Sequence, residues 1–499
     1  MRALAALAAA ALLCGCQPDL RGEARTGGAT ADTRPVIERY ARGDAPPAPA
    51  FNETAVLGSY LRSGQGIVEA PALDAYLNGI LQKLLASWPA ARPGMKVYVS
   101  TDVKYAAESA VGGGIWITRG TLDRAQSEDE IAFILAHEAA HVLLDHQHDR
   151  GGTQKTKDDV ARLVSVGASI AIQVASDRRK ASVTEDALRT VAITAIVDGV
   201  ADSLLFPSWS RDQEERADAL GMDLLLRAGY SRNGAKAVFD QLAAQDRDRD
   251  AETARVTAEA DARTHRQIAD ANAQGINLGG TFAALVGRAM HDLQTGLTAA
   301  AATHGAAEGR DEKVIDYARQ FYGQMPGAPV DEASLQAVLA DPSTARILAA
   351  QDNARKAFLV VDTDPAAAQS LTRDALAADG RSPYVLMVAS EVDRARGDAA
   401  AADAKLKDAA AQRYTPFFVY QRLLSNAARR GDNTGGLALI DEANRRYGSQ
   451  PALMPTQIAL TKRLNRQPEV RRLLLACEFE GTPAIAKQCL DASRTGTFQ

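Results

Sequence analysis

Residues 134–146 read ILAHEAAHVLLDH, and this stretch is the most informative one for predicting the fold and the chemistry of the chain. No Gly or Pro occurs from 131 to 150, and the apolar residues of this run predict one buried helix. Positions i and i+4 share a helix face about one turn apart, so His137 and His141 can point their imidazoles at one metal ion. Glu138 lies beside them.

The alternative for this helix is a core element that carries two hydrogen-bonded histidines and no metal. The chain has only seven His in 499 residues, and two of them fall at ligand spacing around a carboxylate. That coincidence favours a metal site. A catalytic zinc takes three protein ligands and keeps one position for water, so a third ligand is expected elsewhere.

The third ligand is predicted in residues 209–223, which read WSRDQEERADALGMD. Glu214 and Asp218 are again i and i+4 on a predicted helix, so both carboxylates face the same way. We expect Glu214 to bind the metal and Asp218 to accept a hydrogen bond from the outer nitrogen of a ligand His. A solvated, charged helix is the alternative for this stretch taken alone, and its pairing with HEAAH favours the metal site.

These motifs together resemble the gluzincin zinc metalloproteases of the HtpX and CAAX-prenyl-protease type. GGGIWITRGTL (112–122) resembles the Gly-rich, strand-forming segment before the zinc helix, and THGAAEGR (303–310) resembles the family's T-H-P-x-x-x-x-R element. The resemblance covers roughly residues 51–315. The S-R-x-x-E-x-x-A-D element of the family is matched by Ser210, Arg211, Glu214, Ala217 and Asp218.

The resemblance implies one Zn²⁺ per chain, held by His137, His141 and Glu214. Glu138 is then expected to take a proton from water and pass it to the leaving amine. His304 is expected on a loop near the active site, where it could act as a regulatory fourth ligand. Gly305 stands where the family usually has Pro, which changes the stiffness expected of that loop.

The segment before the zinc helix is predicted to be the strand along which an extended substrate adds itself by main-chain hydrogen bonds. This edge strand is expected to include Gly113, Gly114, Ile115 and Trp116. The chain has AAESAVGGG where the family usually has an Asn and a Pro ahead of the Gly run. Pairing by main-chain hydrogen bonds would select unfolded polypeptides as substrates.

The N-terminus reads MRALAALAAAALLCGC, with one positive charge, an Ala/Leu core and a small residue before a Cys. It predicts a lipoprotein signal peptide over 1–15 and a lipidated Cys16; a plain signal peptide cleaved without lipid is the alternative. By analogy with bacterial lipoproteins, Gln17 favours the outer membrane. Residues 16–50 are rich in Gly, Ala, Pro and charge, and we expect a flexible tether there.

Cleavage before Cys16 would remove Arg2 and no acid, so the formal charge would move from −5 to −6. This mild acidity argues against a nucleic-acid partner. Besides the lipidated Cys16, the mature chain would keep only Cys477 and Cys489, which are close in sequence and would lie in an oxidising compartment. A disulfide between them is one expectation.

The C-terminal third repeats every 34 residues, since TDP starts at 363, GDA at 397, GDN at 431 and NRQP at 465. This is the length of a tetratricopeptide repeat. A small residue recurs at the same interval, at Ala375, Ala409, Ala443 and Cys477. The alternative is an irregular helical domain with coincident spacings.

The predicted architecture is therefore α+β and mainly α. A zincin-like metalloprotease domain with a small edge sheet is followed by an α-helical tetratricopeptide-repeat solenoid. The expected divisions are a signal peptide (1–15), a tether (16–50), the metalloprotease domain (51–315), a helical connector (316–350) and the repeats (351–499).

This combination resembles bacterial envelope proteases that join a zinc domain to repeats. It implies an endopeptidase on the periplasmic side of the envelope, anchored by lipid at the outer membrane, that degrades misfolded or misassembled outer-membrane and periplasmic proteins. Protein partners, among them outer-membrane assembly machinery, would bind the repeats. The alternative is a latent or inactive protease that acts as a repeat-based chaperone or adaptor, although the intact Glu138 argues against lost catalysis.

Overall fold

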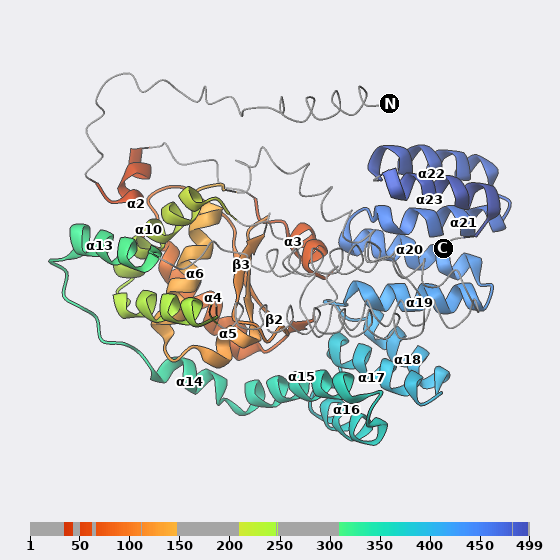
Figure 1. Cartoon of the computed structure of the whole chain (residues 1–499), viewed down its shortest axis with the longest axis horizontal. Helices are drawn as coiled ribbons and strands as arrows, with labels where there is room; N and C mark the ends of the chain where they lie inside the picture. The colour runs from red at the N-terminus through yellow and green to blue at the C-terminus, as the bar shows by residue number, and fades with distance from the viewer. Residues whose placement is uncertain are drawn as a thin grey trace, which may run out of the picture. The chain divides into compact units, whose positions relative to one another are not determined.

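The computed structural model describes residues 34–42, 50–61, 66–110, 112–146, 209–245, 247, 309–481 and 483–497 (Figure 1). Cys16 and His304 lie outside these ranges. None of the helices within these ranges is long and apolar enough to span a bilayer.

The described chain before residue 342 combines one small sheet with several helices. Residues 232–245 are also helical. Asn52, Thr118 and Ser127 each begin a helix by accepting a backbone N–H three residues on, which satisfies a donor that the helix leaves unpaired. The elements in chain order are α2 (Val36–Arg39), η1 (Tyr40–Arg42), α3 (Glu53–Tyr60), β1 (Ile67–Val68), α4 (Pro71–Leu85), β2 (Lys96–Ser100), β3 (Ala107–Ala110), β4 (Gly114–Thr118), α5 (Arg119–Arg124), α6 (Glu128–Leu143), α10 (Arg211–Arg227), α13 (Arg310–Tyr322) and α14 (Ala333–Leu339).

The sheet has the strand order β1-β2-β4-β3, so β4 lies inside the sheet and not at its edge. Trp116 of β4 pairs with Tyr98 of β2 in parallel and with Glu108 of β3 in antiparallel. The predicted substrate-edge strand was therefore wrong, because both sides of β4 carry strand partners. Gly113 does not belong to the strand either: it lies in the turn from β3, where it adopts a φ of 87°, which favours glycine.

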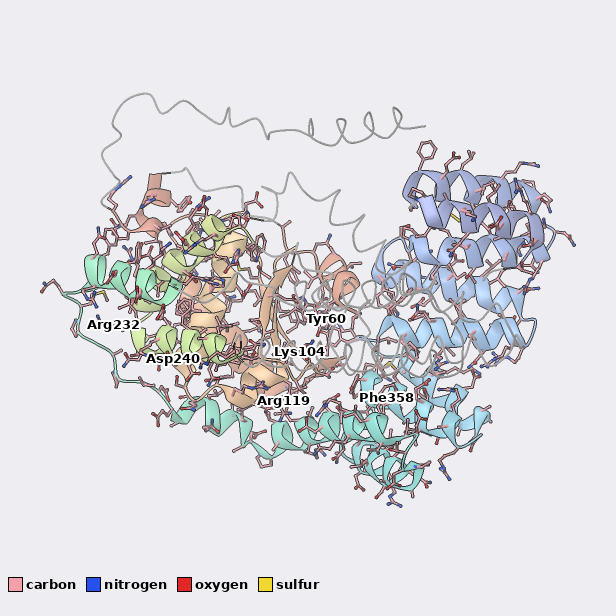
Figure 2. All side chains as sticks on the ribbon, in the orientation of Figure 1. Tyr60, Lys104, Arg119, Arg232, Asp240 and Phe358 are labelled. Atoms are coloured by element: carbon pink, nitrogen blue, oxygen red, sulfur yellow. A yellow bond between two sulfur atoms is a disulfide. The ribbon has the colours of Figure 1, made fainter. Side chains whose placement is uncertain are left out.

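Alternate residues of β4 face two different cores. Ile115 and Ile117 pack in the core that contains α4 and α6. Trp116 faces the other way, where its ring stacks on Tyr60 of α3 at a centroid distance of 3.8 Å and on Tyr98 at 4.8 Å (Tyr60 is labelled in Figure 2). This second core also includes residues from beyond residue 400, namely Tyr414, Phe417, Tyr420 and Tyr447.

The core around the zinc-motif helix continues past residue 315. Val314 and Tyr322 of α13, Leu335 of α14 and Leu348 are buried in the same cluster as α6 and α10. These residues are separated in sequence from α6 but share its apolar environment. The helical connector that we expected at 316–350 thus contributes side chains to this core.

The rest of the described chain is helical. Its helices pack in consecutive pairs, and the pairs nearest residue 342 bury mainly small and aliphatic side chains. The elements are α15 (Pro342–Val360), α16 (Pro365–Asp379), α17 (Pro383–Ala395), α18 (Ala399–Ala410), α19 (Phe417–Arg429), α20 (Asn433–Tyr447), η3 (Pro451–Leu453), α21 (Met454–Arg463), α22 (Gln467–Glu480) and α23 (Pro483–Thr495).

The second helix of each pair starts 34 residues after the previous one, since α16, α18, α20 and α22 begin at 365, 399, 433 and 467. Asp364, Asp398 and Asp432 occupy the N-cap position of the first three and accept a backbone N–H there. The recurring small residues predicted from the sequence are fully buried in each of these helices. The period therefore corresponds to helical hairpins whose close packing requires a small side chain.

Cys477 of α22 and Cys489 of α23 form a disulfide, as one reading of the sequence expected. Both residues are fully buried and pack with Ile458 and Val470. The disulfide links the last two helices of the array. It supplements a small apolar cluster at the end of the chain.

A buried carboxylate fastens the first described helix to α10 and α13. Asp223 of α10 accepts the backbone N–H of Ile37 at 2.8 Å. It also accepts the hydroxyls of Tyr317 at 2.9 Å and Tyr322 at 2.8 Å, both from α13. Burial nevertheless raises the pKa of Asp223 to about 6, because removal from water disfavours its charge more than these donors stabilise it.

Asp223 makes stability depend on pH. Its pKa is higher in the folded chain than the ordinary 3.8, so the folded state binds more protons between pH 4 and pH 6. Stability should therefore fall as pH rises through this window, by about 3 kcal/mol at most. The free energy of unfolding should show a smaller fall in Asp223→Asn. Asp240→Asn, at an exposed residue labelled in Figure 2, is the control, and equal slopes in Asp223→Asn and wild type would contradict the assignment.

Candidate metal centre

The helix α6 carries the two histidines in the interior of the domain. Ser127 accepts the N–H of Glu130 at its N-terminus, and three acids in the first turn complement the positive end of the helix dipole. Every residue from Asp129 to Leu143 is buried. The HEAAH motif is therefore on a buried helix, as the sequence predicted.

The helix α10 presents the two predicted carboxylates to α6. It starts with a capping box in which Ser210 and Gln213 each accept the other's backbone N–H. A Cβ added at Gly221 would lie 3.2 Å from the Cα of His137, so this glycine lets the two helices approach closely. Glu214 is fully buried and Asp218 is 3% exposed.

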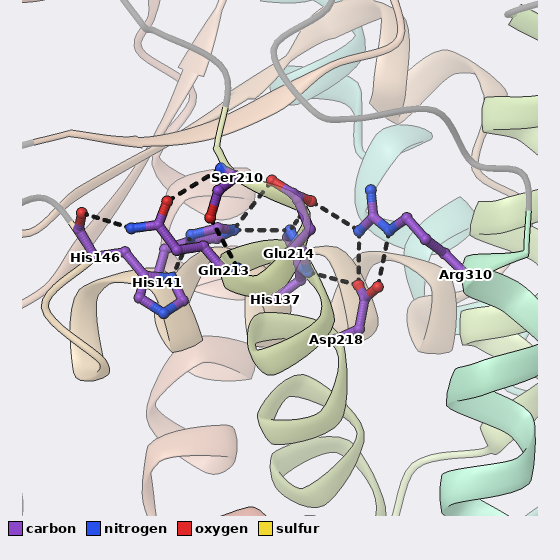
Figure 3. A network of polar contacts seen from close by, with 8 residues as sticks. All are labelled: His137, His141, His146, Ser210, Gln213, Glu214, Asp218 and Arg310. Carbon is purple, nitrogen blue, oxygen red and sulfur yellow. Dashed lines mark hydrogen bonds and ion pairs between the residues drawn. The ribbon is translucent and has the colours of Figure 1, made fainter. Parts of the chain in front are cut away.

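Three donor atoms from these helices converge on one point (Figure 3). Nε2 of His137 and Nε2 of His141 are 3.1 Å apart. The carboxylate oxygens of Glu214 lie 3.5 Å from the first and 3.7 Å from the second. Ligands about 2.0–2.1 Å from a tetrahedral zinc are roughly 3.3 Å from one another, so this donor set and its spacing fit a zinc ion.

The carboxylate of Asp218 and the guanidinium of Arg310 lie next to the donor set. Oδ1 of Asp218 lies 3.0 Å from Nδ1 of His137, which is the contact predicted for it. The guanidinium of Arg310 binds both oxygens of Asp218 at 2.9 and 2.8 Å and also reaches Glu214 at 2.9 Å. Burial alone would raise the pKa of Asp218, but His137 and Arg310 hold that pKa below its usual range.

Sequence reasoning assigned no role to three residues that contact this centre. Arg310 ends the THGAAEGR motif, and the Arg of that motif was the available signal. Trp209 stacks on His141 with a centroid distance of 4.3 Å, and it is the first residue of the stretch 209–223 in which the third ligand was predicted. His146 ended the first quoted stretch and also contacts His141.

The structure brings His137, His141, Glu214 and Asp218 together from helices about 75 residues apart in sequence. Glu138 is 2% exposed beside the first ligand. His304, the predicted regulatory fourth ligand, lies outside the described residues.

Comparison with known proteins identifies the same region. Residues 71–310 match the model of Peptidase family M48. Relatives named as beta-barrel assembly-enhancing proteases are 26% identical over 183 residues in Vibrio cholerae and 22% identical over 187 residues in Escherichia coli K12. These alignments cover 37% and 38% of this chain but only 35% and 36% of the relatives.

The matched region contains the buried donor set and the helices that carry it, and M48 peptidases are zinc metalloproteases. The geometry of the site and the family model thus both indicate a zinc-dependent peptidase. Residues 71–310 therefore resemble the metalloprotease domains of Peptidase family M48, both in sequence and in the donor set that they carry.

Proposed function

We propose that this chain is a zinc-dependent endopeptidase of the bacterial cell envelope that degrades misfolded or misassembled outer-membrane and periplasmic proteins. The observation that carries the proposal is the convergence of His137, His141 and Glu214 next to the buried Glu138. The names of the relatives support the envelope setting. The identity of the substrates follows from that likeness alone.

In this proposal each residue of the centre has one task. Zinc held by the two histidines and Glu214 would polarise the scissile carbonyl and lower the pKa of water toward about 7. Glu138 takes the proton of the attacking water and passes it to the leaving amine. Asp218 fixes the tautomer of His137 through its 3.0 Å contact. Arg310 holds Asp218 in place with two hydrogen bonds and Glu214 with an ion pair.

We propose that an extended substrate lies alongside β3 and not β4. β3 ends the strand order of the described sheet, and it contacts α6, which carries the ligands. A backbone aligned there would be held by main-chain hydrogen bonds, which an unfolded segment can offer and a folded protein cannot. This supports unfolded polypeptides as the substrate class.

Proteolysis of an unfolded protein tests the proposed function. The purified, zinc-loaded chain should cleave casein and leave a stably folded protein intact, and a zinc chelator should abolish the cleavage. Restoration by added zinc would tie the activity to the metal. A zinc-loaded chain that cleaves no unfolded protein would favour the alternative, a latent protease that acts as a chaperone or adaptor.

We further propose that the helical hairpins are tetratricopeptide repeats that bind envelope partners. Their 34-residue period and buried small residues support the assignment. The helical pair α19 and α20 shares a core with the sheet, in which Trp116 lies, so partner binding at this pair would take place next to the peptidase domain. Outer-membrane assembly machinery is the partner class that the names of the relatives suggest.

We also propose that the chain is anchored to the outer membrane through a lipidated Cys16, on the basis of its N-terminal sequence. A labelled fatty acid should be incorporated into the wild-type protein, and Cys16→Ser should move the protein from the membrane fraction to the soluble fraction. Cys14→Ser is the matched control, because Cys14 would be removed with the signal peptide. An unlabelled, soluble wild-type protein would contradict the lipid anchor.

A further inference from the structure

The two histidines of the metal centre have different partners at their outer nitrogens. Nδ1 of His137 lies 3.0 Å from Asp218, a carboxylate. Nδ1 of His141 lies 3.0 Å from Nδ1 of His146, a second imidazole (Figure 3). His141 and His146 are both fully buried. The outer nitrogen of His141 therefore contacts an imidazole, whereas the outer nitrogen of His137 contacts a carboxylate.

The backbone at the end of α6 places His146 against His141. Asp145 has a φ of 53°, in the left-handed region, and its N–H donates to the carbonyl of Val142 at 3.2 Å. The N–H of His146 donates to the carbonyl of His141 at 3.1 Å. These two bonds form a Schellman motif, in which the residue after the left-handed one returns to the last helical turn. That return contact is commonly apolar, whereas here it joins two imidazoles.

The helix α10 holds His146 from the other side. Nε2 of Gln213 donates to the backbone carbonyl of His146 at 3.3 Å, while its Oε1 accepts the N–H of Ser210 at 3.1 Å. Gln213 directly precedes Glu214, the third donor of the site. The segment that contacts His141 is therefore tied to the start of the helix that carries Glu214 (Figure 3).

The tautomer of a metal-bound imidazole determines which of the two Nδ1 atoms of His141 and His146 donates the hydrogen bond and which accepts it. A metal on Nε2 of neutral His141 leaves the proton on Nδ1, and a buried N–H needs an acceptor. Nδ1 of His146 is at the right distance to accept it, and the proton of His146 then lies on its own Nε2. Such outer partners set the tautomer and ring orientation of a ligand.

We propose that His146 is a positioning residue for the metal centre, which accepts the Nδ1–H of His141 and so fixes this ligand for zinc. The inference rests on the zinc site of the proposed function. His146 does not lie among the converging donor atoms, so its effect is on zinc affinity and not on the chemical step.

Zinc affinity of the full chain, measured by competition with a chromophoric chelator, tests this role. His146→Phe fills the space without an acceptor and should weaken zinc binding by about 10- to 100-fold. His146→Asn places an amide oxygen near the position of Nδ1 and should stay within about threefold of wild type. His146→Gln, whose oxygen reaches farther, should resemble the Phe variant.

The Asn and Gln variants keep the test decisive if His146→Phe fails to fold, because the two differ only in where they place the acceptor. Equal zinc affinity in wild type and in the Phe or Gln variant would overturn the proposal. Equal losses in Asn and Gln would also overturn it, since they would show a packing role alone. A wild-type chain that binds no zinc would instead contradict the proposed function itself.

Discussion

The substitution Glu138→Gln is expected to lower casein cleavage by about 10²- to 10⁴-fold, while the purified chain keeps about one zinc ion. The amide preserves the shape of the side chain but cannot accept the proton of the attacking water. Glu138 is 2% exposed next to His137, so water cannot readily substitute for it as a base. Steady-state cleavage rates and metal analysis of the same preparation measure both halves of this expectation.

Glu128→Gln is the matched control for that experiment. Glu128 lies in the first turn of the same helix, away from the converging donors, so its amide should leave cleavage near the wild-type rate. Cleavage by Glu138→Gln at close to the wild-type rate would mean that another group is the general base. Loss of zinc in that variant would instead show that Glu138 supports the metal.

Glu214→Gln should weaken zinc binding by more than about 100-fold, beyond the loss caused by removing an outer partner of a ligand. A neutral amide is a poorer zinc ligand than a carboxylate, and only two donors of full strength would remain at the centre. The protein should still fold, because Arg310 keeps its two hydrogen bonds to Asp218. His141→Ala should lose the metal in the same way. Chelator competition measures the affinities.

Glu215→Gln provides the control for the third ligand. Glu215 is the next residue on α10, but it points outward, where it pairs with Arg211 and Lys313. Exposed ion pairs contribute little, so this variant should fold and bind zinc like wild type. Unchanged zinc affinity in Glu214→Gln would show that the third protein ligand lies elsewhere in the chain.

The spacing of residues along single helices was enough to predict much of the centre. His137 and His141, and Glu214 and Asp218, are each four apart, and a helix brings such pairs to one face whatever surrounds it. The 34-residue period of the sequence recurs in the structure, where α16, α18, α20 and α22 begin at that interval. These features depend on local geometry, which the order of residues fixes.

Long-range packing decided the rest. β4 was predicted at the edge of the sheet, but it lies between β2 and β3 and is buried along its whole length. The sequence of one strand does not show which other strands pair with it. The contact of Arg310 with Asp218 spans 92 residues and required α13 to pack on α10. The lack of a side chain at Gly221 matters only because α10 packs closely against α6 at that residue. The sequence alone thus determined which side chains share a helix face, whereas the tertiary structure decided which faces meet, because burial depends on segments distant in the chain.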